Sequence, residues 1–517
     1  MHRILNSMII FVLGGILSAG EVRVADGRGM AVTMGFDGSA ALPVRVIAPG
    51  HFGVDVRERN WFMLRVEGAS TAMVTIDLEG VNTGSWSSVN PVIMAGDESR
   101  LADRAAFADL ASGTSAMVKA ANGARVPMPG PAQGWDWITD TSFQPSASTP
   151  FLMKPWENVL RLSHRLPASR AVIAMRCPYT SGLDQSQRRR FMDLARQRPD
   201  FLRIHDLGQS TDGRSLWVAE FGTGGATAAT QRPGLVIYAR EHGSEIDAGW
   251  TALGAAEFLS TPAARALLDK ATVFVIPLLD HDAAAAGIYQ GRVIYGFSHE
   301  PTVESKAYAR FFHEWVERGG RIVQVVNIHN IEGGQSQWHA FPVIQAFGDD
   351  RIRAQQWLID RFKFVMRAQG MGVKKDVIGD HVVGDRLSGW LAMRYGAQQI
   401  AFEMNCQAKD RHLTVADLRS AGALLAQTAI AAISDPVFDP VHSAIGAHLA
   451  TRRRLVERYQ PIREWLFAGS AISFEQNLWR TPELEMRHKH IDDIPAWLMP
   501  VYRGGRASAN DIPVLSP

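Results

Sequence analysis

Near the end of its second quarter, the chain carries the stretch Gly234-Leu235-Val236-Ile237-Tyr238-Ala239-Arg240-Glu241-His242-Gly243-Ser244-Glu245. The apolar run at its beginning predicts a buried strand, and a helix is expected to follow from about Trp250. Two side chains that bind metal ions well, His242 and Glu245, lie between the strand and the helix. The stretch therefore predicts a strand–loop–helix unit with potential ligands in its loop.

The same alternation of apolar strands and helices continues downstream. Strands are predicted at Thr272–Ile276, Ile322–Val326 and Ile400–Phe402, and helices at Trp250–Leu259, Val303–Glu317, Arg351–Arg367 and Ala416–Ile433. Strands that are apolar throughout and separated by helices are typical of a sheet covered on both faces. We therefore expect residues 183–435 to form an α/β domain with a mostly parallel, mixed sheet between helices.

The preceding residues follow a different pattern. Short runs rich in β-branched and aromatic residues, separated by Gly and Ser, occur at Trp61–Val66, Met73–Leu78 and Ala171–Met175. Such runs predict an antiparallel β-sandwich over residues 21–182. Residues 436–517 form an extension to which the sequence assigns no role.

Composition excludes some classes of function. The chain has 54 basic and 52 acidic residues, a net charge of +2, so nucleic-acid binding has little electrostatic support. Two cysteines, Cys177 and Cys406, are too few for a thiolate zinc site. A metal ion would have to use histidine and carboxylate ligands.

Residues 1–20 combine Arg3, a short apolar run and a small-residue exit, which predicts a secretory signal. The run is too short for a comfortable membrane span, and no other stretch is long and apolar enough. A periplasmic or secreted location is expected if the signal is real; if the segment is instead a buried helix or strand, the location is cytoplasmic.

Four potential site residues lie at or near predicted strand ends, where open α/β sheets bind ligands. They are His242, Glu245, His329 and Glu403; the third follows the second by 84 positions, and the fourth follows the third by 74. Hydrolytic zinc sites use three protein ligands and leave a position for water. His242, Glu245 and His329 are the predicted ligands, and Glu403 is the predicted general base. A His-x-x-Glu pattern alone is weak, because it recurs at His329 and Glu332.

Several segments together resemble the zinc metallocarboxypeptidases, and specifically the cytosolic-carboxypeptidase subfamily, which carries a β-sandwich before its catalytic domain. The segments are Ala239–Glu245, Pro277–Asp282, Val326–His329, Ala401–Met404, Leu207–Arg214, Asn60–Phe62 and Cys177–Thr180. The resemblance covers about residues 41–433. It implies one zinc ion per chain and hydrolysis of a peptide or amide bond.

The resemblance also implies roles for residues outside the ligand set. Asp282 matches the aspartate that accepts a hydrogen bond from the first zinc histidine. Arg292, with Arg240 as the weaker candidate, would stabilise the oxyanion of the transition state.

The chain departs from the family where substrate is bound. Family members use an Asn-Arg pair to bind the C-terminal carboxylate of the substrate, but here the stretch reads Gly296-Phe297-Ser298-His299-Glu300. A bidentate arginine is hard to replace, and His299 is the predicted substitute. His381 stands where many members have a substrate-covering tyrosine.

Three hypotheses follow from an intact metal site with altered recognition. The chain is a metallocarboxypeptidase with atypical C-terminal recognition, a zinc amidase or deacylase on the same scaffold, or a catalytically silent zinc-binding module. Glu403 argues against the silent module, which has no use for a general base. The sequence carries no signal for the oligomeric state.

Overall fold

The computed structural model describes most of the chain between residues 21 and 434. The described residues are 21–56, 61–81, 89–102, 115–119, 124–144, 158–224, 229–289, 291–297, 301–330, 337–340, 362, 366, 368, 377–378, 386–395, 397–404 and 412–434. The predicted signal segment 1–20, the extension 436–517 and most of the predicted helix Arg351–Arg367 lie outside them.

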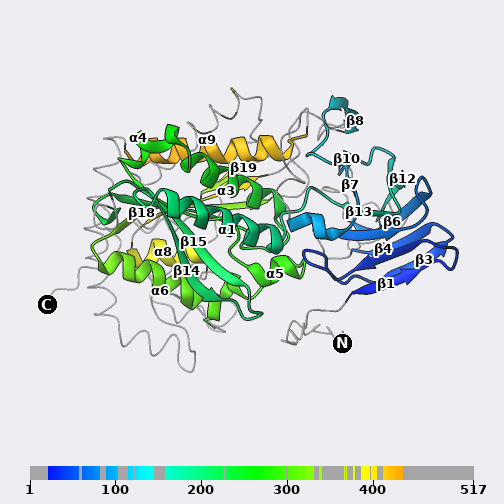
Figure 1. The fold of residues 1–517 in the computed structure, drawn as a ribbon, viewed down its shortest axis with the longest axis horizontal. Helices are drawn as coiled ribbons and strands as arrows, with labels where there is room; N and C mark the ends of the chain where they lie inside the picture. Colours follow the sequence, from blue (N-terminus) through cyan, green and yellow to red (C-terminus); the bar gives the residue numbers. More distant parts are fainter. Residues whose placement is uncertain are drawn as a thin grey trace, which may run out of the picture.

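The first part of the chain forms two β-sheets that share one core (Figure 1). The first sheet has the order β1 (Val22–Ala25), β2 (Ala31–Met34), β5 (Met63–Glu67), β13 (Arg170–Ala174), β7 (Val92–Ala95) and β10 (Trp135–Trp137). The second has the order β11 (Thr141–Gln144), β12 (Asn158–Arg165), β6 (Met73–Val81), β4 (His51–Asp55) and β3 (Val44–Ala48). A separate hairpin joins β8 (Ala116–Lys119) and β9 (Arg125–Met128), and a 3-10 helix, η2, spans Glu98–Ala102.

Alternating side chains of these strands explain the shared core. Phe52 and Val54 of β4 and Val32 and Met34 of β2 are fully buried in the same apolar cluster, although they belong to different sheets. The predicted antiparallel β-rich region is therefore confirmed. One pairing among the described strands departs from the prediction, because β4 and β6 run parallel. Their register places Phe52 opposite Ile76.

The second part of the chain is built on one eight-stranded sheet. Its order is β14 (Leu202–Gln209), β15 (Ser215–Phe221), β17 (Thr272–Ile276), β16 (Pro233–Ala239), β18 (Arg321–Asn330), β21 (Gln398–Met404), β19 (Gln337–Ala340) and β20 (Val377–Ile378). The four pairings β16–β17, β16–β18, β18–β21 and β19–β20 are parallel, and the other three are antiparallel. The mostly parallel mixed sheet is confirmed.

Helices cover both faces of this sheet. The described ones are α1 (Ser181–Gln197), α3 (Ile246–Leu259), α4 (Arg265–Leu268), α5 (His281–Ala285), α6 (Val303–Glu317), α8 (Leu387–Tyr395) and α9 (Val415–Ile433), with 3-10 helices η5 (Pro262–Ala264) and η6 (Val293–Tyr295). Figure 1 shows α9 on one side of the sheet and α6 with α8 on the other. Alternation along β16 accounts for this, since Leu235 and Ile237 join the core containing α3 and α9, while Val236 and Tyr238 join the core containing α6 and α8.

Two differences from the predicted boundaries affect the site. The strand predicted at Ile322–Val326 continues to Asn330, so His329 lies within β18 instead of after it. Likewise β21 extends to Met404, and Glu403 lies inside a strand. Strand β17 and helix α6 have the predicted bounds.

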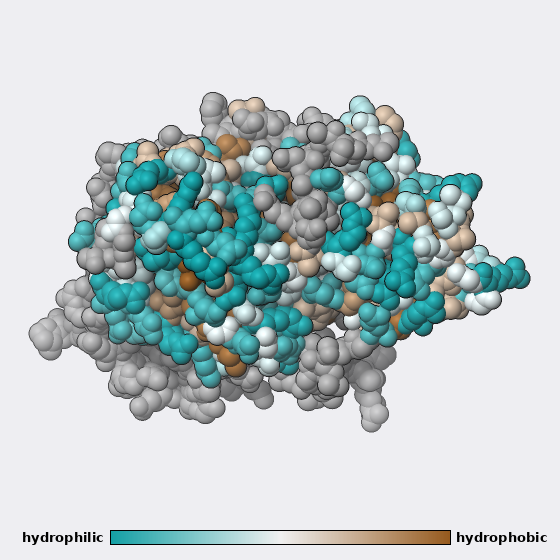
Figure 2. Space-filling model, in the orientation of Figure 1, coloured by the Kyte–Doolittle hydropathy of each residue, from teal (hydrophilic) through white to brown (hydrophobic). Residues whose placement is uncertain are grey.

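The face drawn in Figure 2 is mostly hydrophilic over the described residues, with apolar residues scattered singly. In the part of the chain that the structure describes, none of the helices combines the length and apolar character needed to cross a membrane.

Candidate metal centre

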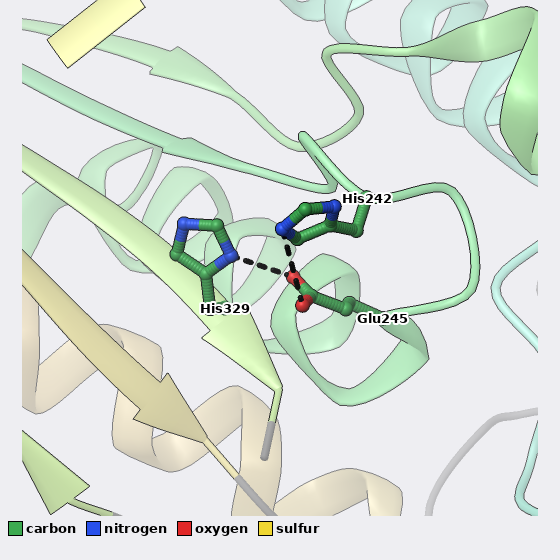
Figure 3. Close-up of side chains that lie close together, drawn as sticks. All are labelled: His242, Glu245 and His329. Carbon is green, nitrogen blue, oxygen red and sulfur yellow. Dashed lines mark hydrogen bonds and ion pairs between the residues drawn. The ribbon is translucent and has the colours of Figure 1, made fainter. Parts of the chain in front are cut away.

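Three neighbouring elements bring the predicted ligands together. His242 lies in the loop after β16, Glu245 is the N-cap residue of α3, and His329 lies on β18, the parallel neighbour of β16. Figure 3 shows the two imidazole rings and the carboxylate turned toward one another. One ligand atom from each lies within 4.8 Å of the others, and all three side chains are buried.

Close packing shapes the loop that carries His242. A Cβ atom on Gly243 would lie 2.4 Å from the carbonyl carbon of Ala283, so the loop passes too close to α5 for any side chain. Arg240 adopts the left-handed backbone conformation at φ 60°, which is unfavourable for a residue other than glycine. Its fully buried guanidinium donates to the carbonyl oxygens of Tyr179 and Gly243. Both terminal nitrogens of Arg240 therefore bind backbone carbonyls, which anchors the loop, and its contact with substrate stays a prediction.

The donor set fits a zinc ion. His329 Nδ1 lies 2.9 Å from Glu245 Oε2, and His242 Nε2 lies 3.9 Å from Glu245 Oε1. Ligand atoms on one zinc ion lie about 3–4 Å apart, so closure onto an ion needs a movement of about 1 Å or less. Two imidazoles and one carboxylate form a ligand set used in hydrolytic zinc sites, which leave a position for water.

The two histidines carry different charges in the absence of an ion. Burial, together with nearby His329 and Arg386, holds the pKa of His242 well below its ordinary value. Burial also opposes charge on His329, but the carboxylates of Glu245 and Glu241 outweigh it and raise its pKa to about 10. His242 is therefore neutral near pH 7, while His329 is a cation between two carboxylates.

Glu403 lies directly beside His329, because the two residues pair in register on the parallel strands β18 and β21. Burial and the nearby Glu245 carboxylate raise the pKa of Glu403 to about 7, against the opposing effect of His329 and Arg386. A carboxylate that gains and loses a proton near neutral pH is suited to general acid–base catalysis.

Asp282 does not have the predicted hydrogen bond to His242. It accepts hydrogen bonds from Ser210 Oγ at 2.7 Å, from the Asp212 backbone at 3.0 Å and from Arg214 at 2.7 Å. These donors belong to the turn between β14 and β15, which comes over the start of α5. Nδ1 of His242 is buried and has no hydrogen-bond partner among the described residues.

The remaining predicted substrate residues have different outcomes. Arg292 precedes η6 and is partly buried, and its contact with the transition state stays a prediction. His299 and His381 lie outside the described residues, as does Glu332.

Four residues near the ligands were missed by sequence reasoning. Tyr289 stacks on His242, with ring centroids 4.1 Å apart and an interplanar angle of 9°. Glu241, Asn327 and Arg386 surround the opposite edge of His329. Asn327 could have been predicted from the sequence, because it lies two residues before His329 and therefore on the same face of the strand.

Comparisons with known proteins give a family match and solved structures of similar fold. Residues 189–292 match the family model described as zinc carboxypeptidase, a segment that contains His242 and Glu245 and ends before His329. None of the curated proteins matches the chain.

Two solved structures show the shared fold. The chain is similar to a metallo-carboxypeptidase from Burkholderia cenocepacia, with 16% identity, a TM-score of 0.58, and coverage of 78% of this chain and 99% of that one. It is also similar to a metallo-carboxypeptidase from Pseudomonas aeruginosa, with 17% identity, a TM-score of 0.52, and coverage of 78% and 98%. At 16% and 17% identity, these likenesses show that the chain shares the fold of these two proteins.

Proposed function

We propose that the chain hydrolyses a peptide bond at the C-terminus of its substrate, with one zinc ion held by His242, Glu245 and His329. The observation that carries the proposal is the meeting of these three side chains on β16, α3 and β18, with Glu403 beside them on β21. A bound zinc ion would lower the pKa of a water molecule from about 15.7 towards 7. The segments that resemble the cytosolic-carboxypeptidase subfamily support placing the chain there.

Glu403 moves the proton in this proposal. Its carboxylate takes a proton from the attacking water and returns it to the nitrogen of the leaving amine. In the metal-free chain, burial raises the pKa of this carboxyl, which favours a group that can return the proton. A carboxylate held in this way favours a catalyst over the silent zinc-binding module.

Replacement of Glu403 by Gln tests the catalytic assignment. The amide keeps the shape but cannot accept the proton, so turnover should fall by about 10²- to 10⁴-fold while zinc stays bound. Glu314→Gln, at an exposed position on α6, is the matched control and should leave both properties unchanged. Unchanged turnover in Glu403→Gln with zinc bound would rule out the general base.

Zinc analysis and matched substrates separate the remaining alternatives. Elemental analysis should find one zinc ion per chain, lost in His242→Ala. A peptide set should then be assayed with free and with amidated C-termini. Release of the last residue from free C-termini only would establish the carboxypeptidase, whereas cleavage of both sets, or of acyl amides alone, would establish the amidase or deacylase.

A further inference from the structure

The edge of His329 that faces away from Glu245 meets a buried carboxylate. Glu241 directly precedes His242 and is fully buried. Its Oε2 atom lies 3.4 Å from His329 Nε2, and Asn327 Nδ2 lies 2.6 Å from the same ring nitrogen. Glu241 therefore belongs to the loop of the first histidine but contacts the second.

Three further contacts hold the Glu241 carboxylate in place. Asn327 Nδ2 donates to Oε2 at 2.9 Å, and the Tyr238 hydroxyl donates to Oε1 at 3.4 Å. Tyr238 is in turn held by the backbone N–H of Ser388 at 3.1 Å. Arg386 NH1 lies 3.6 Å from Oε2 and supplies the opposite charge. These partners come from β16, β18 and the start of α8, so the carboxylate is fixed from three sides.

A buried carboxylate needs such an arrangement, because burial of an isolated charge costs several kcal/mol. Arg386 NH1 supplies the opposite charge to this carboxylate, whose Oε2 atom lies next to a ring nitrogen of His329. When Nδ1 of His329 faces a metal ion, the ring proton has to lie on Nε2, toward Glu241 Oε2 at 3.4 Å. The donor Asn327 Nδ2, which is 2.6 Å from Nε2 in the metal-free chain, then has to move away from the ring while it keeps its hydrogen bond to Oε2.

We propose that Glu241, supported by Asn327 and Tyr238, is the positioning residue of the second metal histidine, His329. The inference rests on the proposed function only in its metal assignment. A carboxylate that accepts the remaining N–H of a ligating imidazole fixes the tautomer and the ring orientation and increases ligand basicity. The resemblance assigned such a role to Asp282 on the first histidine; the contacts of the described residues assign it to Glu241 on the second.

The test is the zinc affinity of Glu241→Gln, measured with Zn²⁺ alone by competition against a chelator. Loss of this carboxylate should weaken zinc binding by about 10- to 100-fold. Glu220→Gln is the matched control, because Glu220 is also buried and also pairs with an arginine and a histidine, Arg203 and His205 on β14. It should leave zinc affinity within about twofold of the wild type.

The outcomes separate this inference from the proposed function. A wild-type chain that binds no zinc would overturn the metal assignment itself. Wild-type zinc binding with equal affinity in Glu241→Gln, or an equal loss in Glu220→Gln, would overturn only the role of Glu241.

A second variant keeps the test decisive if Glu241→Gln does not fold. Tyr238→Phe removes the hydroxyl from Glu241 Oε1 but keeps the carboxylate, so it should weaken zinc binding by a few fold. Glu241→Asp should recover part of the affinity lost in Glu241→Gln, because the charge is retained. Wild-type affinity in Tyr238→Phe together with no recovery in Glu241→Asp would contradict the positioning role.

Discussion

The two histidines of the candidate metal centre lie 5.1 Å apart, centroid to centroid, in opposite surroundings. His242 stacks on Tyr289, and its Nδ1 atom is buried without a hydrogen-bond partner among the described residues. His329 lies between Glu245 and Glu241, with Asn327 and Arg386 at its far edge. One imidazole is neutral in an apolar contact, and the other is charged in a polar network.

The different surroundings of His242 and His329 indicate which contacts hold the site in place without an ion. His242 is ready to bind a metal, because it has no proton to lose near pH 7. His329 has to lose one, but the carboxylates that charge it also keep its ring in place. We infer that the contacts of His329 stabilise the metal-free fold, whereas His242 contributes to stability mainly when the metal is bound.

The largest expected effect compares His329→Asn with His242→Asn in the presence of a chelator. His329→Asn leaves Glu241 and Glu245 without their shared cation, so the free energy of unfolding should fall by about 4 kcal/mol. His242→Asn removes a neutral ring and should cost about 1 kcal/mol. Urea denaturation of the metal-free proteins measures both, and equal losses would contradict the difference between the two sides.

Much of this site could be predicted from local pattern. The apolar runs at β17 and β16, the helical spacing of α6, and the order of His242, Glu245, His329 and Glu403 each depend on a few neighbouring residues or on strand ends. Strand length was harder, because the β18 pairing with β21 continues through the polar residues that end the apolar run.

The contacts around the ligands could not be predicted, because they depend on tertiary packing. Asp282 accepts a hydrogen bond from Ser210, which lies 72 residues earlier in the chain. Arg386 reaches His329 from a position 57 residues later, and no local pattern marks it. The parallel pairing of β4 with β6 was missed for the same reason, since strand patterns do not reveal which neighbour a strand adopts.

The next effect concerns the contacts that join the β-sandwich to the residues beside His329. Arg176, which follows β13, forms a buried ion pair with Asp247 of α3 and donates to Asn330 Oδ1 at 3.2 Å. Asn330 Oδ1 also accepts from the Asp247 backbone at 3.0 Å. The β-sandwich therefore contacts the residue after His329 and the helix that begins with Glu245.

Arg176→Met should lower the free energy of unfolding by about 3 kcal/mol, because it leaves Asp247 buried and uncompensated. Arg161→Met is the control: its ion pair with Asp77 lies in the sandwich, and its side chain is 38% exposed against 7% for Arg176. That variant should cost about 1 kcal/mol or less. Zinc affinity should fall a few fold only in Arg176→Met. Similar stability losses in the two variants would contradict a particular role of Arg176 in joining the β-sandwich to the metal centre.

The smallest expected effect tests whether burial, the largest cause of the lowered pKa of His242, keeps a histidine neutral in this fold. His412 is not a ligand and lies just before α9, where its Nε2 atom is 2.7 Å from Asn90 Nδ2 and 2.8 Å from the Lys119 carbonyl oxygen. Its ring meets the edge of Trp137 at 5.2 Å. Burial lowers the pKa of His412 from 6.5 to about 4.

The sign of the pH dependence follows from this lowered pKa. Between pH 6.5 and 4 the unfolded chain binds a proton at His412 that the folded chain does not, so stability is complete above pH 6.5 and falls as the pH falls. From pH 7 to pH 5 the loss from this residue should be about 2 kcal/mol. Urea denaturation of the wild type and of His412→Gln across this range measures it by difference, because the carboxylates titrate equally in both. Parallel curves for the two proteins would show that burial in this fold does not suffice to hold an imidazole neutral, and the neutral state of His242 would then need another cause.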